Sequence, residues 1–278
     1  MTVSRSRWRY AREPWTGNFM SENILFDVND GVGRVIFNRP EARNAFTLAM
    51  YARLEEIVQQ AHNDSSVRAL VLMGAGDKAF AAGTDISEFK AFSTAEDALN
   101  YEAGMDRVLS TLERSTIPTI AAIAGVCTGG GAAIAACCDL RIGAANMRFG
   151  MPMARTLGNC LSMANYARMA ALLGAARVMD IIYTARLIES EEARAIGLLS
   201  EVLPDFPTLS KRADELARTV ADHAPLTLRV TKESLRRIRE KMTPEDDPDL
   251  IRMCYMSKDF REGMDAFLNK RKPEWKGI

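Results

Sequence analysis

The chain has 278 residues, of which 47% are hydrophobic, so it can bury the core of one domain plus an appendage. Lys and Arg together number 36, as do Asp and Glu, so the net charge is near zero. The overall electrostatic field of the chain therefore favours neither nucleic acid nor an acidic surface as a partner. No apolar run is long enough for a membrane span. The five cysteines include no C-x-x-C pair, so we expect reduced thiols, a cytoplasmic location and no metal site.

The first 22 residues differ from the rest of the chain. They carry four arginines, Arg5, Arg7, Arg9 and Arg12, and have no apolar centre, which excludes a secretory signal. We expect residues 1–22 to be a flexible extension. An organelle-targeting segment is the alternative.

Residues 23–204 show the order strand, strand, helix more than once. Asn29-Asp30-Gly31 supplies turn residues for a hairpin, and apolar runs or alternation predict strands over 24–28, 32–37, 69–73, 119–123 and 139–142. Helical spacing of apolar residues predicts helices from about 47, over 95–113 and after the glycines at 129–131. Short connections between these elements predict an α/β fold of stacked layers.

The pattern changes after Pro204. Helices with charged faces are predicted over 209–223, 225–241 and 249–270. We therefore expect residues 205–278 to form a helical C-terminal segment that covers an active site or mediates assembly.

Two segments of small residues follow predicted buried strands. They span residues 80–85 and 124–131, and the second ends where a helix begins. Glycine and alanine let a ligand approach the backbone, and the first N–H groups of a helix favour negative charge. Two such N–H groups that converge on one point would stabilise an oxyanion. The alternative is that the glycines only permit close packing; a phosphate loop is discounted because no G-K-[ST] follows.

Seven segments stand in the chain in this order: 38–45, 80–86, 124–131, 139–141, 149–152, 191–198 and 262–267. In their residues and their spacing, these segments resemble the crotonase, or enoyl-CoA hydratase/isomerase, superfamily. The resemblance implies a crotonase-like spiral of ββα units with a helical C-terminal region. It also implies a trimer or a dimer of trimers, with no permanently bound cofactor and coenzyme A as part of the substrate.

The resemblance also assigns site residues. It implies that the N–H groups of Thr84 and Gly130 are the oxyanion donors. The residues around these donors, Ala82, Gly83, Asp85, Ile86 and Gly129, are expected to contact substrate. Backbone near Ala42 and Arg43 should line the path of the adenine and pantetheine, and Lys270 should lie near the nucleotide phosphates. A solvated helix end is the alternative for Lys270.

The chain departs from the family at the acid–base positions. Hydratases of the family use two glutamates, and the corresponding residues here are Ala133 and Met153, which cannot exchange a proton. Asp106 has apolar neighbours at helical spacing, so we expect it as an acid or base; an ion pair with Arg107 or Arg155, or a position facing solvent, is the alternative. Met153, Arg155 and Asn159 are expected to line the acyl end.

Three functions follow from these residues. The first is an acyl-CoA or enoyl-CoA enzyme that stabilises an enolate, with a lyase or isomerase reaction. The second is another reaction of the same fold, such as thioester hydrolysis, decarboxylation or C–C cleavage. The third is a protein that binds a CoA thioester without catalysis.

Overall fold

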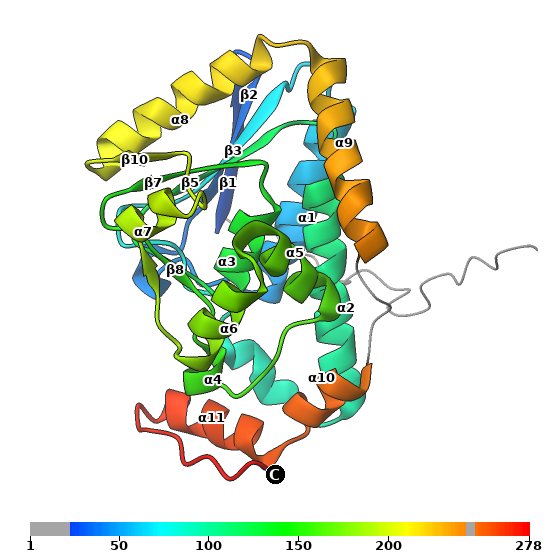
Figure 1. The fold of residues 1–278 in the computed structure, drawn as a ribbon, viewed down its shortest axis with the longest axis vertical. Helices are drawn as coiled ribbons and strands as arrows, with labels where there is room; N and C mark the ends of the chain where they lie inside the picture. The colour runs from blue at the N-terminus through cyan, green and yellow to red at the C-terminus, as the bar shows by residue number, and fades with distance from the viewer. Residues whose placement is uncertain (1–22, 243–247) are drawn as a thin grey trace, which may run out of the picture.

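Two β-sheets form the frame of the computed structural model, which describes residues 23–242 and 248–278 (Figure 1). The predicted extension, residues 1–22, lies outside the described residues. The larger sheet has the strand order β1 (Ile24–Asn29), β2 (Val32–Phe37), β3 (Ala69–Gly74), β5 (Thr119–Ile123), β7 (Leu140–Ala144) and β10 (Glu201–Leu203). The smaller sheet has the order β4 (Ala79–Ala81), β6 (Val126–Thr128), β8 (Arg148–Gly150) and β9 (Ile188–Glu189).

The chain passes repeatedly from the larger sheet to the smaller one. Strands β3, β5 and β7 are each followed by a strand of the smaller sheet, and a helix comes next. Only β1–β2 and β8–β9 are antiparallel among the named strand pairs of the described residues. The predicted α/β fold of ββα units is therefore confirmed.

The N-terminal hairpin and helix form where the sequence predicts them. Asp30 and Gly31 both have positive φ, 49° and 76°, which matches the twist of a two-residue hairpin turn. Helix α1 (Leu48–Asn63) begins after Thr47, whose side chain accepts a hydrogen bond from Met50 N at 3.2 Å. Its apolar stripe is buried in the core cluster that also contains residues of β2 and β3.

Helices cover both faces of the larger sheet. Leu70 and Leu72 of β3 point into the core beside α1, α2 (Ala95–Arg114) and α3 (Gly130–Cys137). Val71, one residue along, points to the opposite face, which α8 (Phe206–Ala221) covers with Leu209, Ala213 and Ala217. This alternation explains why the strands read as continuous apolar runs.

Several helices depart from the sequence prediction. The single helix predicted over 249–270 is wrong: α10 (Pro248–Tyr255) ends and α11 (Lys258–Leu268) begins, because Ser257 caps α11 by accepting from Phe260 N at 2.9 Å. The sequence analysis also did not predict four helices that follow β8 and precede β10. They are α4 (Met153–Thr156), α5 (Met163–Leu173), α6 (Ala175–Tyr183) and α7 (Ser190–Ala195).

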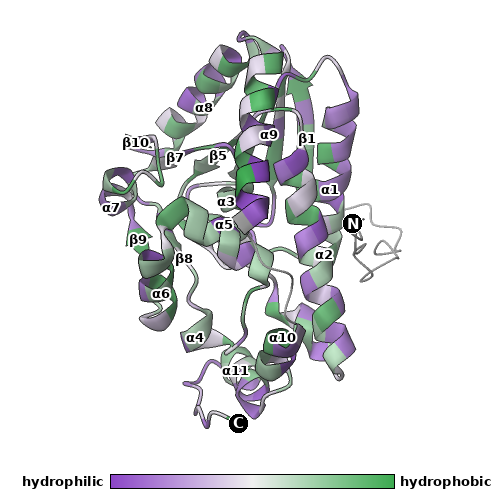
Figure 2. Cartoon of the chain, turned by 45° about the vertical axis from the view of Figure 1, so that its right-hand side comes forward, coloured by the Kyte–Doolittle hydropathy of each residue, from purple (hydrophilic) through white to green (hydrophobic). Residues whose placement is uncertain are grey.

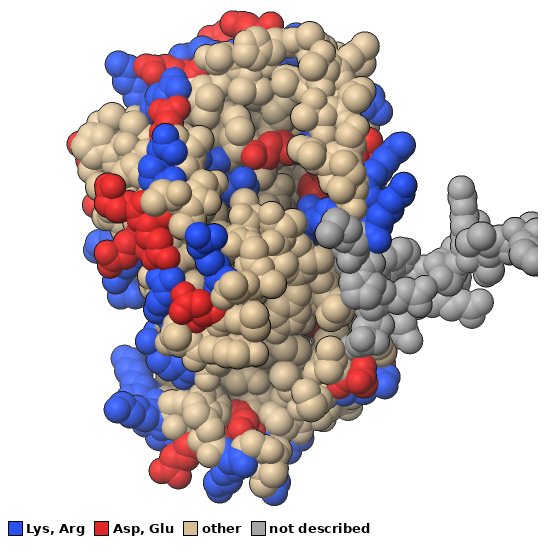
Figure 3. Space-filling view, in the orientation of Figure 1, with Lys and Arg blue, Asp and Glu red and all other residues tan. Residues whose placement is uncertain are grey.

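Helix α9 (Pro225–Met242) has no buried residue among its side chains up to Lys241. Leu226, Val230, Leu235 and Ile238 are 58 to 71% exposed. Figure 2 shows hydrophobic residues along α9 interleaved with hydrophilic ones. In Figure 3 uncharged residues form most of the centre of the face shown, while charged side chains gather along the side of α6, α7 and α8.

A buried arginine joins α5 to α2. Arg168 is 6% exposed and forms ion pairs with Asp106 at 3.2 Å and Glu113 at 3.4 Å. It also donates to Ser110 Oγ at 2.9 Å, and Glu113 pairs in addition with Arg239 of α9. Charges removed from water in this way depend on their partners.

We expect Arg168→Met to lower the free energy of unfolding by about 3 kcal/mol, because Asp106 and Glu113 lose a buried cation. Chemical denaturation measures this loss. The matched control is Arg237→Met: Arg237 is 70% exposed and pairs with Glu233 on the surface of α9, so its loss should stay below about 1 kcal/mol. Equal losses in the two variants would contradict a structural role for the buried arginine.

Candidate functional site

The two small-residue segments lie side by side because the strands before them are neighbours. Strands β4 and β6 pair in parallel, with Ala79 opposite Val126. Their carboxyl ends therefore meet at one edge of the smaller sheet. There, a Cβ atom built on Gly83 would lie 3.8 Å from Gly130 N, and one built on Gly129 would lie 3.4 Å from Gly83 Cα.

The first segment is fixed from behind by residues 43–46. Ala82 N donates to Arg43 O at 3.1 Å. Phe46 N donates to Gly83 O at 2.8 Å, and Asp85 N donates to Phe46 O at 2.7 Å. These hydrogen bonds use the backbone groups of Ala82, Gly83 and Asp85 that face residues 43–46. The N–H group of Thr84 faces the opposite side of the segment.

Side chains of the N-R-P-E-A-R-N-A motif hold residues 43–46 in turn. Asn44 is buried, and its amide donates to Ala79 O at 2.7 Å and Ala75 O at 3.2 Å. Arg39 donates to Asp85 Oδ2 at 3.1 Å. Although burial opposes ionisation, hydrogen bonds from Ser87 and Arg39 hold the pKa of Asp85 below its usual value. The motif is thus a brace for the loop that follows β4.

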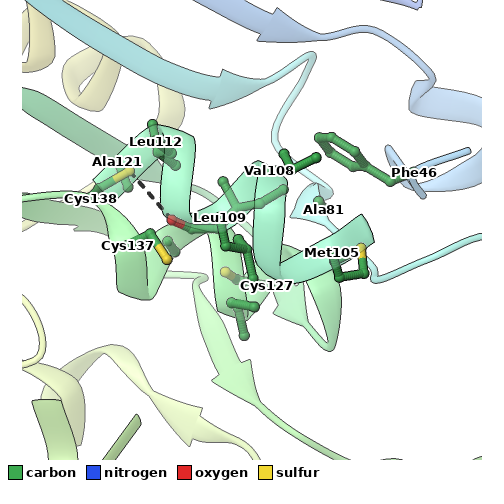
Figure 4. Packing of buried hydrophobic residues seen from close by; sticks show 14 of the residues in the cluster. Phe46, Ala81, Met105, Val108, Leu109, Leu112, Ala121, Cys127, Cys137 and Cys138 are labelled. Atoms are coloured by element: carbon green, nitrogen blue, oxygen red, sulfur yellow. Dashed lines mark hydrogen bonds between the residues drawn. The ribbon is translucent and has the colours of Figure 1, made fainter. Parts of the chain in front are cut away.

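Glycine is required where the second segment turns into α3. Gly129 has φ +53°, which side chains rarely adopt. A Cβ on Gly131 would lie 2.3 Å from Ala81 O, so β4 can approach the helix only at a glycine. The small residues of α3 also let α2 pack closely, and Figure 4 shows Leu109 and Leu112 of α2 beside the end of α3.

The amides of Thr84 and Gly130 share one property. Within residues 23–242 and 248–278, neither donates a hydrogen bond to another group of the protein. Both residues are partly exposed. Gly130 N is also the first amide of α3, where the helix dipole favours negative charge. The two segments thus carry two neighbouring N–H groups able to bind one acceptor.

Three hydroxyl groups lie beside Thr84 and Gly130, and the sequence analysis did not predict the two that belong to tyrosines. Tyr51 Oη lies 2.9 Å from Thr84 Oγ1, which lies 2.7 Å from Tyr101 Oη. A Cβ on Gly130 would lie 2.1 Å from Tyr51 Oη. Tyr51 and Tyr101 belong to the buried stripes of α1 and α2, so the only available signal was an aromatic hydroxyl within an apolar stripe.

Both tyrosines keep their protons at neutral pH. Burial raises the pKa of Tyr51 well above its usual value; the hydrogen bond with Thr84 opposes this rise, and the charge of Glu102 adds to it. Burial likewise raises the pKa of Tyr101, with smaller contributions from Tyr51 and Glu102. The hydroxyl groups are therefore neutral hydrogen-bond donors.

Asp106 lies on a different side of α2 from Tyr101. It lines a cavity of about 620 Å³ between α1, α2 and α10, where Ser162 Oγ donates to its carboxylate at 2.8 Å. Its ion pair is with Arg168, which the sequence reading did not name. The assignment of Asp106 as acid or base stays a prediction.

Asn159 belongs to a second polar group near the same helix. Its side-chain amide donates to Tyr255 Oη at 3.3 Å, and Tyr255 Oη donates to Glu102 at 2.5 Å. Asn159 Oδ1 is buried and has no hydrogen-bond partner among the described residues. Glu102 is 4% exposed and lines the cavity that also contains Asp106.

The remaining predicted residues differ in their burial and in the elements that carry them. Ala42 ends the short helix η1 (Pro40–Ala42), and Ile86 begins η2 (Ile86–Ala91), both beside the braced loops. Ala133 and Met153 are buried. Arg155 is exposed on α4, and Lys270 is exposed after the end of α11.

Two features are absent from residues 23–242 and 248–278. No helix in them has the length and hydrophobicity needed to cross a bilayer. No group of three or more His, Cys, Asp or Glu side chains in them suits a metal ion.

Comparison with known sequences supports one family. The enoyl-CoA hydratase/isomerase family model matches residues 27–278. A short-chain-enoyl-CoA hydratase of Clostridium acetobutylicum is 33% identical over 255 residues, which are 91% of this chain and 97% of the relative. A crotonyl-CoA hydratase of Syntrophomonas wolfei is 32% identical, over 90% of this chain and 96% of the relative.

Solved structures agree with the sequences. An enoyl-CoA hydratase/carnitine racemase from Magnetospirillum magneticum has a TM-score of 0.75 and 32% identity, over 93% of this chain and 97% of that one. A methylmalonyl-CoA decarboxylase in complex with 2-nitronate-propionyl-CoA has a TM-score of 0.85 and 27% identity, over 92% and 99%. The chain belongs to the enoyl-CoA hydratase/isomerase family, the crotonase superfamily.

Proposed function

We propose that the chain binds an acyl-CoA or enoyl-CoA thioester and that the amides of Thr84 and Gly130 bind the thioester carbonyl oxygen. The observation that carries the proposal is the pair of neighbouring N–H groups that no group of the described protein accepts from. Relatives named as hydratases of short enoyl-CoA thioesters support this substrate class.

The two amides would act most strongly after charge has formed on the oxygen. An enolate or tetrahedral intermediate carries that charge, and the position of Gly130 at the start of α3 adds the favourable end of a helix dipole. Loss of one donor from such a site typically costs about 3–4 kcal/mol of transition-state stabilisation. Backbone near Ala42 and Arg43, with Lys270, is proposed to hold the nucleotide part of the thioester.

A second candidate reaction is decarboxylation of an acyl-CoA that carries a carboxylate. Ala133 and Met153 cannot take a proton from substrate or water, which disfavours hydration. Loss of carbon dioxide generates the same enolate without a base. The likeness to a methylmalonyl-CoA decarboxylase, at 27% identity, supports this candidate. Binding without turnover is the third possibility.

We expect the protein to bind 2-nitronate-propionyl-CoA at least about 100-fold more tightly than propionyl-CoA, because the amides favour an anionic analogue. Isothermal titration calorimetry measures both dissociation constants, and coenzyme A without an acyl group is the control. Equal affinity for the two thioesters would remove the proposed role of the amides.

We expect slow hydration of crotonyl-CoA, because one positioned proton-transfer group contributes about 10²–10⁴-fold in rate and two such positions hold Ala133 and Met153. Spectrophotometric assays of crotonyl-CoA and methylmalonyl-CoA compare the two reactions, with Asp106→Asn as a matched variant. Rapid hydration that survives in Asp106→Asn would show that another group supplies the proton. Hydration lost in that variant would identify Asp106 as the working base.

Self-association is proposed from helix α9 and the C-terminal helices. None of the described side chains of α9 is buried, although Leu226, Val230, Leu235 and Ile238 are apolar. Met253 and Phe267 are also more than half exposed. Apolar surface of this kind marks protein interfaces, and a closed cyclic trimer or a pair of trimers buries it without open ends.

We expect sedimentation of the wild type to show a trimer or hexamer at micromolar concentration. The double variant Val230→Glu with Leu235→Glu should shift it toward monomer, because two charges enter the apolar face of α9. Val28→Lys, at a 41% exposed position on the edge strand β1, is the control and should keep the assembly. A monomeric wild type would end this proposal.

A further inference from the structure

We propose that a hydroperoxide oxidises Cys160 and Cys254 to a reversible disulfide bond, and that this bond ties helix α10 to the segment before α5. All five cysteines of the chain are free thiols in the structure. These two come from distant parts of the chain and yet lie in contact. The inference does not depend on the thioester chemistry proposed above.

The segments that carry the two cysteines lie side by side. Cys160 stands between α4 and α5, and Cys254 stands in the last turn of α10. The residues next to them are joined by a hydrogen bond, which Asn159 Nδ2 donates to Tyr255 Oη at 3.3 Å across 96 positions of the chain. The contact between the two segments is therefore established independently of the cysteines.

The thiol groups themselves are also in contact. Cys160 and Cys254 share a hydrogen bond, and Cys160 Sγ lies 3.8 Å from Leu250 O. Leu250 precedes Cys254 by one helical turn, and the side chains of a helix lean toward its N-terminus. The Cys254 thiol thus leans toward the turn that Cys160 contacts. The sulfur atoms need only a short approach to reach the length of a disulfide bond, about 2.05 Å.

Cys254 is the thiol that an oxidant meets first. It is partly exposed, whereas the other four cysteines are buried. The hydrogen bond from Cys160 stabilises the thiolate and lowers the pKa of Cys254 to about 7, although burial opposes this change. The same interaction raises the pKa of Cys160. At neutral pH a reactive thiolate therefore lies beside a protonated thiol.

The other three cysteines provide a contrast within the same chain. Cys127, Cys137 and Cys138 are at most 4% exposed. Burial raises the pKa of Cys137 and of Cys138 to about 12, and it raises the pKa of Cys127 as well. These groups remain thiols at neutral pH, and a thiol is a poor nucleophile toward peroxide. Oxidation should therefore select the pair formed by Cys160 and Cys254.

The reaction balances with a hydroperoxide as the oxidant. The Cys254 thiolate attacks one oxygen of hydrogen peroxide, the O–O bond breaks, and hydroxide leaves and takes up a proton to become water. The sulfur of Cys160 then attacks the resulting sulfenic acid, so that an S–S bond forms, the S–O bond breaks and the Cys160 proton leaves with the hydroxyl group as a second water. Two electrons pass from sulfur to oxygen, and a dithiol reductant reverses the step.

The bond would fasten the C-terminal helices to the core of the protein. Cys254 lies beside Tyr255, whose hydroxyl group donates to Glu102 of α2. The native contacts already bring the two cysteines together, so the bond mainly restricts the unfolded chain, in which it closes a loop of more than 90 residues. Oxidation should therefore stabilise the fold. Simple packing of two sulfur atoms is the rival explanation, and it predicts no bond.

The first test treats the folded wild type with hydrogen peroxide, blocks the remaining thiols and digests the protein with trypsin without a reductant. Cleavage after Arg and Lys places Cys160 in residues 156–168, Cys254 in residues 253–258 and the other three cysteines in residues 115–141. We expect the loss of two of the five thiols and a mass equal to the first two peptides joined. Dithiothreitol should restore both thiols. Five unchanged thiols, a bond that involves residues 115–141, or Cys254 oxidised without a link to Cys160 would each overturn the proposal.

The second test compares urea unfolding of the oxidised and reduced protein. Closing so long a loop should raise the midpoint by about 1–2 M urea. Cys160→Ala and Cys254→Ala should each abolish this shift, whereas the matched control Cys137→Ala, also at a buried cysteine, should keep it. Because the wild type itself reports the shift, the test holds even where a variant does not fold. A midpoint that oxidation leaves unchanged or lowers would show that the bond does not fit this arrangement of α10, and would contradict the proposal.

Discussion

The parallel pairing of β4 with β6 is the constraint on which the site depends. Each strand has only three residues, yet their pairing fixes where two distant parts of the chain end. Parallel neighbours release their following loops at the same edge of a sheet, and here both loops consist of small residues. The Gly83–Thr84 and Gly129–Gly130 peptides therefore approach each other without any direct hydrogen bond between them among the described groups.

Two kinds of support keep these loops in place. Behind the first loop, the side-chain amide of Asn44 donates hydrogen bonds to Ala75 O and Ala79 O. The backbone groups of Arg43 and Phe46 form hydrogen bonds with residues 82–85. Behind the second, Gly131 allows β4 to touch the start of α3. Polar groups that are satisfied away from the site leave the remaining amides as the groups available to a ligand.

Sequence patterns predicted the helices, strands and turns that are determined by residues close together in the chain. Turn residues gave the hairpin at Asp30, apolar runs gave the central strands, and the glycines at 129–131 marked the start of α3. Long-range packing decided the rest. The break at Ser257 follows from a cap that competes with helix continuation, and the hydroxyl groups of Tyr51 and Tyr101 meet only because two helices converge on Thr84. A single chain offers no signal for that meeting, because an aromatic residue in an apolar stripe normally indicates core.

Helix α2 contacts different parts of the chain at its two ends. Near its start, Tyr101 forms a hydrogen bond with Thr84. At its other end, Glu113 forms ion pairs with Arg168 of α5 and Arg239 of α9. Twelve residues separate these points, about 18 Å along the axis. Because α2 is one unbroken helix over this length, the ion pairs at one end and the Thr84 contact at the other position the same element. Helices α5 and α9 are thereby linked through α2 to the loop that follows β4.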